Sequence, residues 1–214
     1  MQSKPLVPRP SLARDAQSGS RDARFVEPTS RAWLDPGAAL RAVPESATIA
    51  GMFIGPLAEA ARQRKLPLPS ARARYVPFQF YPLREHVQLL IEAAGTLFGD
   101  EPLRRALRLL GRSAPQSLLG STVGKVVLGS ASGVHQVVAA IVNTYPVHIR
   151  PSSAALLEIE AGRAVVRLEQ VHFFLDSHHV GVFEGALHHA GVRGQVRIDQ
   201  QDPTTAELLL TWET

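Results

Sequence analysis

The stretch that decides the fold is FFLDSHHVGVFEGALHHAGVRGQVRI, from Phe173 to Ile198. It begins with aromatic residues typical of a strand end, and Asp176 is a candidate cap for a helix over Ser177–Ala190. A turn with two glycines follows that helix, and residues 195–199 alternate between polar and apolar side chains as a strand does. The stretch therefore predicts a helix that connects two strands.

Alternating residues on both sides of this stretch predict an antiparallel sheet. Residues 154–171 are expected to form a hairpin with its turn at Ala161-Gly162, and residues 205–213 are expected to form the last strand. On one face of the hairpin, the expected pairs are Leu157 with Val166 and Ile159 with Ala164. In the last strand, the inward residues are Ala206, Leu208, Leu210 and Trp212.

The first half of the chain is mainly helical in pattern. A short extended segment and a helix are expected over residues 48–64, and an amphipathic helix over Leu83–Phe98. A helix capped by Asp100 is expected to end at Gly111, a third to run from Ser113 to about Leu128, and a fourth to cover Gly133–Asn143. The predicted fold class is α+β, with N-terminal helices packed on a C-terminal antiparallel sheet of ββαββ order.

The composition predicts one domain with an N-terminal extension. The chain has 214 residues, 45% of them apolar, and no cysteine, which excludes disulfides and thiolate metal sites. Residues 1–45 form a basic extension rich in Pro, Ser and Arg that we expect to be disordered, and residues 46–214 form the domain. The alternative for residues 25–45 is a short helix after Pro36 in a segment that docks on the domain. No segment has the length and hydropathy of a signal peptide or a membrane span, so we expect a cytoplasmic protein.

The net charge of +4 does not indicate a nucleic-acid-binding protein. Residues 1–24 carry +3 of it, which leaves about +1 for the rest of the chain. A protein that binds a polynucleotide carries its positive charge on a folded face. We therefore expect no nucleic-acid partner.

Residues 46–213 resemble a family of unknown function that occurs as many paralogues in myxobacteria. The resemblance rests on GMF at 51–53, RYVPFQFYPLRE at 74–85, FFLDSHHVGVFEGAL at 173–187, VRGQVRI at 192–198 and LTW at 210–212. The order of helices followed by ββαββ is also similar to vinyl-reductase-type domains, TRAPP-type subunits and heme-nitric-oxide-binding sensors. That similarity of fold implies a hydrophobic or tetrapyrrole ligand, or a protein partner, and gives no catalytic residue.

The helix over Ser177–Ala190 carries the first group of candidate binding residues. Gly181 and Gly185 form a flat strip, and each glycine costs about 1 kcal/mol of helix stability relative to alanine. Close approach of another backbone, a partner or a ligand would offset that cost. Glu184 and His188, at the edge of the apolar face, are candidate ligand contacts. The alternative is a Glu–His surface pair beside glycines that pack within the domain.

The aromatic loop after Pro69 carries the second group of candidates, which are Arg72, Arg74, Tyr75, Phe78, Phe80 and Tyr81. Arginine suits a phosphate or carboxylate, and aromatic faces suit a flat ligand. The alternative is an irregular loop held to the core by its aromatic residues, with arginines that pair with nearby acids. A second arginine cluster, which consists of Arg104, Arg105, Arg108 and Arg112, is interpreted as the solvated face of its helix.

Three other motifs carry little chemical information. Gly120–Lys125 lacks the first glycine and the final hydroxyl of a phosphate-binding loop. The histidine pairs 178–179 and 188–189 lie roughly 15 Å apart on one helix, too far to share a zinc ion. His135 is the best candidate for a heme ligand, but the Tyr-x-Ser-x-Arg signature of the heme-nitric-oxide-binding sensors is missing. We therefore expect no metal site.

No nucleophile and base are paired in the sequence, so no catalytic residue is predicted. The leading hypothesis is a non-enzymatic domain that senses a small hydrophobic or anionic molecule, or acts as an interaction module. Its ligand would lie between the helices and the sheet, with the 74–81 loop at the mouth. The alternatives are a structural homodimer or adaptor without a ligand and, third, an enzyme of unknown class; the cofactor is unknown.

Overall fold

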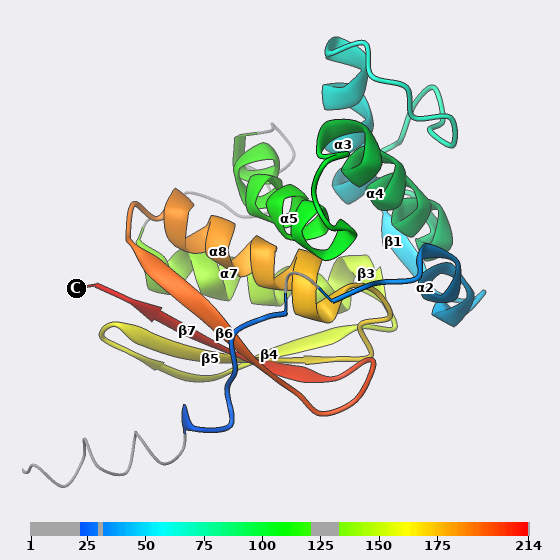
Figure 1. The fold of residues 1–214 in the computed structure, drawn as a ribbon. Helices are drawn as coiled ribbons and strands as arrows, with labels where there is room; N and C mark the ends of the chain where they lie inside the picture. The colour runs from blue at the N-terminus through cyan, green and yellow to red at the C-terminus, as the bar shows by residue number, and fades with distance from the viewer. Residues whose placement is uncertain (1–21, 30–31, 121–132, 214) are drawn as a thin grey trace, which may run out of the picture.

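The structure is a computed structural model and describes residues 22–29, 32–120 and 133–213 (Figure 1). The described helices are α2 (Pro36–Ala42), α3 (Gly51–Gln63), α4 (Leu83–Leu97), α5 (Leu103–Gly120), α7 (Val134–His148), the π-helical turn η1 (Leu175–His179) and α8 (Val180–His189). The described strands are β1 (Thr48–Ala50), β2 (Phe80–Pro82), β3 (Ile149–Arg150), β4 (Ser153–Glu160), β5 (Arg163–Glu169), β6 (Gly194–Gln200) and β7 (Ala206–Trp212).

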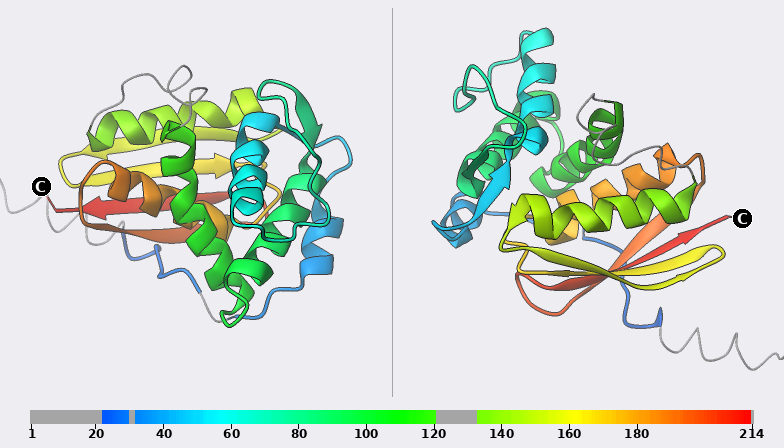
Figure 2. Two further views of the ribbon diagram at one scale, coloured as in Figure 1. Left: turned by 90° about the horizontal axis from the view of Figure 1, so that it is seen from above. Right: turned by 180° about the vertical axis from the view of Figure 1, so that it is seen from behind.

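A four-stranded antiparallel sheet forms the C-terminal half of the domain. Its strand order is β4-β5-β7-β6, and α8 connects β5 to β6. Helices α7 and α8 lie side by side on one face of the sheet, and α5 lies on top of α8 (Figures 1 and 2). The predicted α+β fold of N-terminal helices and a ββαββ sheet is therefore confirmed.

One predicted strand pairing is wrong. Leu156, rather than Leu157, lies opposite Val166, because the pairing register shifts between Leu156 and Glu158. The extra residue is a β-bulge, which turns one side chain of the bulged strand away from its expected face. Leu157 is consequently 46% exposed, whereas the pair of Ile159 with Ala164 is as predicted.

The other face of the sheet is partly covered by residues 22–29, which were expected to be disordered with the rest of the extension. Phe25 is buried against Val165 and Leu209, and Val26 forms an antiparallel bridge with Ile198. Arg24 forms ion pairs with acidic residues of β6 and β7. One large aromatic side chain is therefore enough to bind this short segment to the sheet, despite its polar sequence. Residues 1–21 lie outside the described part.

The N-terminal helices stand at one end of the domain (Figure 2). A small sheet of order β2-β1-β3 joins them to α7, because β3 directly follows that helix. Strand β2 lies within the aromatic loop, so the prediction that this loop has no regular structure is wrong over Phe80–Pro82. Backbone hydrogen bonds to β1 supply the order that the proline-rich sequence does not.

Two predicted helix boundaries are also wrong. Helix α5 continues through Gly111 and Pro115 to Gly120, although Gly111 was expected to end it and a new helix to begin at Ser113. Gly111 faces the backbone of η1 and α8, so its missing side chain serves helix packing and not a helix end. Helix α7 runs to His148 instead of Asn143. Residues 121–132, which include most of the Gly120–Lys125 motif, lie outside the described part.

Candidate functional site: a histidine-lined cavity

A cavity of about 270 Å³ lies where the N-terminal helices meet the helices that cover the sheet. Helices α3 and α4 form one wall, and α5, α7, η1 and the start of α8 form the other. Its apolar lining includes Met52, Phe53, Leu57, Leu90, Leu97, Phe98, Leu109, Leu110, Leu118, Ile141, Ile149 and Val182. The cavity therefore lies between two groups of helices, and not between the helices and the sheet as predicted.

One end of the cavity is polar and consists of three histidines and a tyrosine. His86 comes from α4, His178 and His179 from η1, and Tyr145 from α7. The ring centroids of His86 and His178 are 6.4 Å apart, and those of His178 and His179 are 5.5 Å apart. Side chains separated by more than 90 residues of sequence therefore meet in one cluster.

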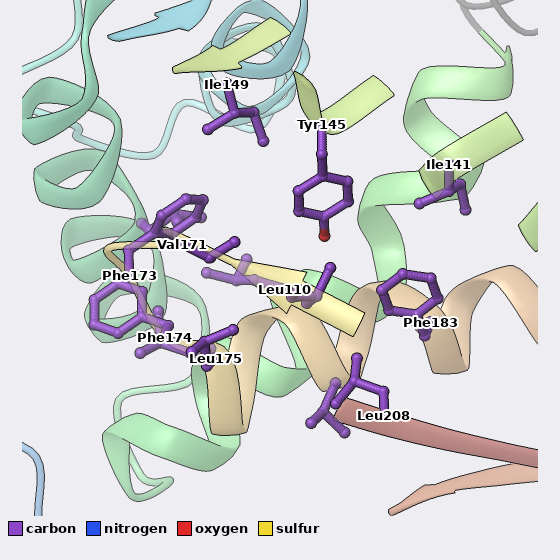
Figure 3. Packing of buried hydrophobic residues seen from close by; sticks show 14 of the residues in the cluster. Leu110, Ile141, Tyr145, Ile149, Val171, Phe173, Phe174, Leu175, Phe183 and Leu208 are labelled. Atoms are coloured by element: carbon purple, nitrogen blue, oxygen red, sulfur yellow. The ribbon is translucent and has the colours of Figure 1, made fainter. Parts of the chain in front are cut away.

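Phe173 lies among the three imidazoles. Its ring centroid is 4.5 Å from that of His179, 5.7 Å from that of His86 and 6.0 Å from that of His178. The hydroxyl of Tyr145 points into the core (Figure 3) and lies 2.7 Å from Nδ1 of His179. Aromatic contacts on several sides thus hold the histidine rings in defined orientations.

The backbone before α8 has an unusual conformation that buries both neighbouring histidines. Phe174 has φ 44° and ψ 43°, which is the left-handed region that non-glycine residues rarely adopt. The amide of His179 then donates to the carbonyl of Phe174, five residues earlier, and this bond closes a π-helical turn. His178 and His179 are only 7% and 2% exposed. Turns of this kind recur at functional sites.

Asp176 does not cap the helix as predicted. It lies inside the π-helical turn, where its carboxylate pairs with Arg104 of α5. The turn has no side-chain cap, because the chain enters it through Phe174 in the left-handed conformation. Asp176 thus does lie at the start of a helical segment, but that segment begins as a π-helical turn and not as a capped α-helix.

Three imidazole nitrogens of the histidines that line the cavity are buried and have no hydrogen-bond partner among the described residues: Nδ1 of His86, Nδ1 of His178 and Nε2 of His179. Burial lowers the pKa of His86 to about 3 and that of His178 to about 4, and lowers the pKa of His179 well below its usual value. All three rings are neutral near pH 7. Buried polar atoms normally have partners, so three unpaired ones at one cavity indicate a place for an external group.

Helix α5 packs against η1 and α8 through glycines. A side-chain carbon at Gly181 would lie 2.9 Å from the carbonyl carbon of Arg108, and one at Gly111 would lie 3.0 Å from that of His178. Gly185 faces the backbone of Arg112 in the same way. The strip of glycines thus contacts another backbone within the same chain.

The arginines on α5 were predicted to form a solvated face. Arg105 and Arg112 are exposed as predicted, whereas the side chains of Arg104 and Arg108 are only 17% and 18% exposed. Arg108 and Arg112 both bond to the carboxylate of Glu184. Burial favours the protonated form of Glu184, but the bonds from the two arginines outweigh it and lower the pKa of that carboxyl. Of the four arginines, only Arg105 has the simple pairing of a surface helix, with Glu101 one turn earlier.

The predicted contact of Glu184 with His188 is absent from the contacts of the described residues, because the two arginines take both carboxylate oxygens. His188 is exposed. His135 is exposed as well and stacks edge-on against Trp212, away from the cavity. Among the described residues, no group of His, Asp and Glu side chains has the arrangement of a metal site.

The loop candidates form a network of their own outside the described cavity lining. Arg72 pairs with Glu85, and the hydroxyl of Tyr75 donates to the same carboxylate. The backbone amide of Val76 donates to the hydroxyl of Tyr81. Arg74 and Phe78 are exposed, the latter by 60%. None of the six loop candidates, Phe80 included, is among the described residues that line the cavity.

The residues that the sequence reasoning missed are His86, His178, His179 and Tyr145. The two consecutive histidines follow an apolar strand end, and His86 lies on the apolar side of an amphipathic helix. Three histidines at positions that should be buried are a signal that sequence can give. Which of them meet is set by the tertiary fold.

Solved structures of H-NOX proteins have the same fold as this chain. The H-NOX protein of K. algicida is 13% identical with a TM-score of 0.55, and covers 78% of this chain and 97% of its own. An H-NOX protein of S. oneidensis in the Fe(II)NO state is 13% identical with a TM-score of 0.56, and the match covers 78% of this chain and 100% of that protein. A mutant of T. tengcongensis H-NOX is 11% identical with a TM-score of 0.55, and the match covers 78% of this chain and 98% of that protein. At these identities the similarity shows the fold alone.

Heme, which the H-NOX fold implies, does not fit the described cavity. An apolar cavity of about 150 Å³ holds a benzene molecule. By proportion, 270 Å³ accommodates about eleven non-hydrogen atoms, whereas a heme has roughly forty. Of the described lining residues only Arg64 carries a formal charge, so two propionates would share one cation.

None of the described helices is long and apolar enough to cross a membrane. Two further comparisons bear on the identity of the chain. No curated protein matches the sequence. Residues 42–213 match the family model described as protein of unknown function (DUF2378), so the chain belongs to this family.

Proposed function

We propose that the protein is a non-enzymatic sensing domain that binds a small, mainly apolar molecule in the cavity between α3, α4 and α5. The observation that supports this function most directly is an apolar cavity with three unpaired imidazole nitrogens at one end. Small-molecule sites typically combine such an apolar lining with a few convergent polar groups. The H-NOX-like fold is consistent with a sensing role.

The hydroxyl groups at the cavity support binding over catalysis. Ser113 donates to the carbonyl of Leu110, Ser117 to that of Ser113, and Thr144 to that of Ile141. Each of these three serine and threonine hydroxyls is thus engaged by its own helix, and the lining hydroxyl that contacts a histidine is the phenol of Tyr145. A serine or threonine nucleophile needs a base within hydrogen-bond reach, and these three lack one among the described residues.

The walls of the cavity give a physical route from binding to a signal. An occupant would contact the N-terminal helices on one side and α5, α7 and η1 on the other. It would therefore stabilise one arrangement of these two groups of helices relative to others, as any ligand that prefers one state does. A partner that reads this arrangement would complete the sensor.

A cavity-filling variant tests the proposal. We expect naphthalene, 1-naphthol or both to bind the wild-type protein in isothermal titration calorimetry and to raise its melting temperature. Ala114→Phe, which places a ring in the cavity wall, should abolish binding, and Ala155→Phe, at an exposed position of β4, should not. Native mass spectrometry of freshly purified protein should show a bound small molecule. Binding of every probe to Ala114→Phe with unchanged affinity would contradict the assignment of the cavity.

A further inference from the structure

We propose that the histidine end of the cavity recognises an uncharged hydrogen-bonding group, such as a hydroxyl, phenol, lactam or indole N–H, on an otherwise apolar molecule of one or two rings. This inference rests on the proposed function and specifies the chemistry of the ligand. It uses His86, His178 and His179 as ligand contacts, which no sequence motif assigns.

The hydrogen bonds already present in the cluster determine what it offers. His178 donates to the backbone carbonyl of Leu107, which leaves Nδ1 as a lone-pair acceptor, because a neutral imidazole has one donor and one acceptor. His179 contacts the hydroxyl of Tyr145 through Nδ1 and also makes a backbone hydrogen bond with Phe173, and its Nε2 has no partner among the described residues. Nδ1 of His86 takes either role according to its tautomer. The cluster can therefore accept a hydrogen bond from a ligand group through His178 and, in one tautomer of His86, donate a hydrogen bond to it.

The charges around the cluster favour an uncharged group. Burial keeps the three imidazoles neutral, so they offer no counter-ion at the polar end. Among the described lining residues, Arg64 is the one that carries a formal charge, and it is exposed at the C-terminal end of α3. A cation there is favoured by the helix dipole alone. An ion at the histidine end would be desolvated without a partner, which is costly.

The size of the cavity limits the apolar part. The volume of about 270 Å³ corresponds to about eleven non-hydrogen atoms by comparison with a benzene-sized cavity. Phe53, Phe98 and Phe173 in the lining suit a flat, aromatic body. A bicyclic aromatic molecule with one polar substituent matches both the volume and the polar end.

The local structure around the histidines indicates that the site is built for a ligand. Phe174 in the left-handed region, the π-helical turn and the unpaired nitrogens each disfavour the folded state. The left-handed Phe174 and the π-helical turn lie in one short segment that brings His178 and His179 to the cavity, where His86 of α4 joins them. Departures from local rules concentrate at functional sites, where they are offset by what the site does.

Three probes with one apolar body separate the alternatives: naphthalene, 1-naphthol and 1-naphthoate. We expect 1-naphthol to bind about tenfold tighter than naphthalene, the effect of one good neutral hydrogen bond. We expect 1-naphthoate to bind more weakly than 1-naphthol. In His178→Leu and His86→Leu the preference for 1-naphthol should fall toward one, and His189→Leu, an exposed control, should leave it unchanged.

The outcomes distinguish this inference from the proposed function. Equal affinity for naphthalene and 1-naphthol would overturn the role of the histidines while the cavity site stands. Tightest binding of 1-naphthoate, lost in Arg64→Gln, would overturn it in favour of an anion-binding mouth. If none of the three probes binds, the proposed function fails and this inference with it. His86→Leu should also be more stable than wild type without a probe, because it removes a buried unpaired nitrogen.

Discussion

Replacing Gly181 with alanine tests whether α5 and α8 are in backbone contact. A methyl group at this position would lie 2.9 Å from the carbonyl carbon of Arg108 and 3.0 Å from the amide nitrogen of Arg112, and closer still to the carbonyl oxygen of Arg108. Ordinary van der Waals contact begins at 3.4 Å. The two helices would therefore have to separate by at least roughly half an ångström, since neither contact is with a flexible side chain.

The expected loss of stability follows from two opposing effects. Alanine is a better helix former than glycine by about 1 kcal/mol. Overpacking in a close helix contact costs about 1–3 kcal/mol and in some cases more. Because the clash is with backbone, we expect a net loss of about 2 kcal/mol in the free energy of unfolding, which lowers the melting temperature by about 4–8 °C for a chain of this size.

Gly95 provides the matched control, because it lies in the interior of α4 and a side-chain carbon there would meet nothing within 4 Å. Gly95→Ala should gain up to about 1 kcal/mol from helix propensity alone. Urea unfolding followed by circular dichroism measures both variants. If Gly181→Ala is as stable as Gly95→Ala, α5 and α8 do not approach as the structure has them.

Lowering the pH from 7.5 to 5.5 should reduce the free energy of unfolding by about 4 kcal/mol. Burial lowers the pKa values of His86, His178 and His179 in the folded protein, whereas the same histidines take up protons below about pH 6.5 in the unfolded chain. Each of the three histidines then contributes about 1.4 kcal/mol at pH 5.5. The loss should be about one third smaller in His86→Leu; equal pH dependence would argue against a buried His86. Phe25→Ala should lower the free energy of unfolding by about 3 kcal/mol, and Trp33→Ala, at an 80% exposed position, should leave it nearly unchanged in the same urea titration. Glu184→Gln should cost about 2 kcal/mol by removing the carboxylate between Arg108 and Arg112, and high salt should reduce the difference from wild type; no change in calorimetric stability would show that the ion pairs are solvated.

The fold was predictable because its periodic segments carry consistent signals. Strand β7 alternates in sequence, and Leu208 and Leu210 are fully buried on the face toward the helices. The helix α8 was predicted within three residues of its observed start. The bulge at Leu157 was not predictable, because one extra residue in a strand changes no hydropathy pattern and shows only in the pairing with β5.

The candidate site was predictable to a smaller extent. The stretch that decided the fold does contain His178 and His179, but a regular helix was assumed there, and the left-handed Phe174 leaves no mark in the sequence. The third histidine, His86, lies on a helix that reaches this segment only through tertiary packing. The arginines of α5 were assigned to solvent because charge on a helix usually is solvated, and the acidic partners of Arg104, Arg108 and Arg112 lie more than 70 residues away.

Helix α5 lines the cavity with one side and packs on η1 and α8 with the other, which explains the distribution of leucine, glycine and arginine along it. On one side, Leu109, Leu110 and Leu118 line the cavity. On the other, Gly111 and the arginines hold η1 and α8 in backbone contact and in ion pairs. Because close-packed backbones slide or rotate as units and do not deform gradually, a change in cavity volume that moves α5 must also move the histidine-bearing turn. A ligand in the proposed site would therefore be coupled to the packing of α5 on η1 and α8.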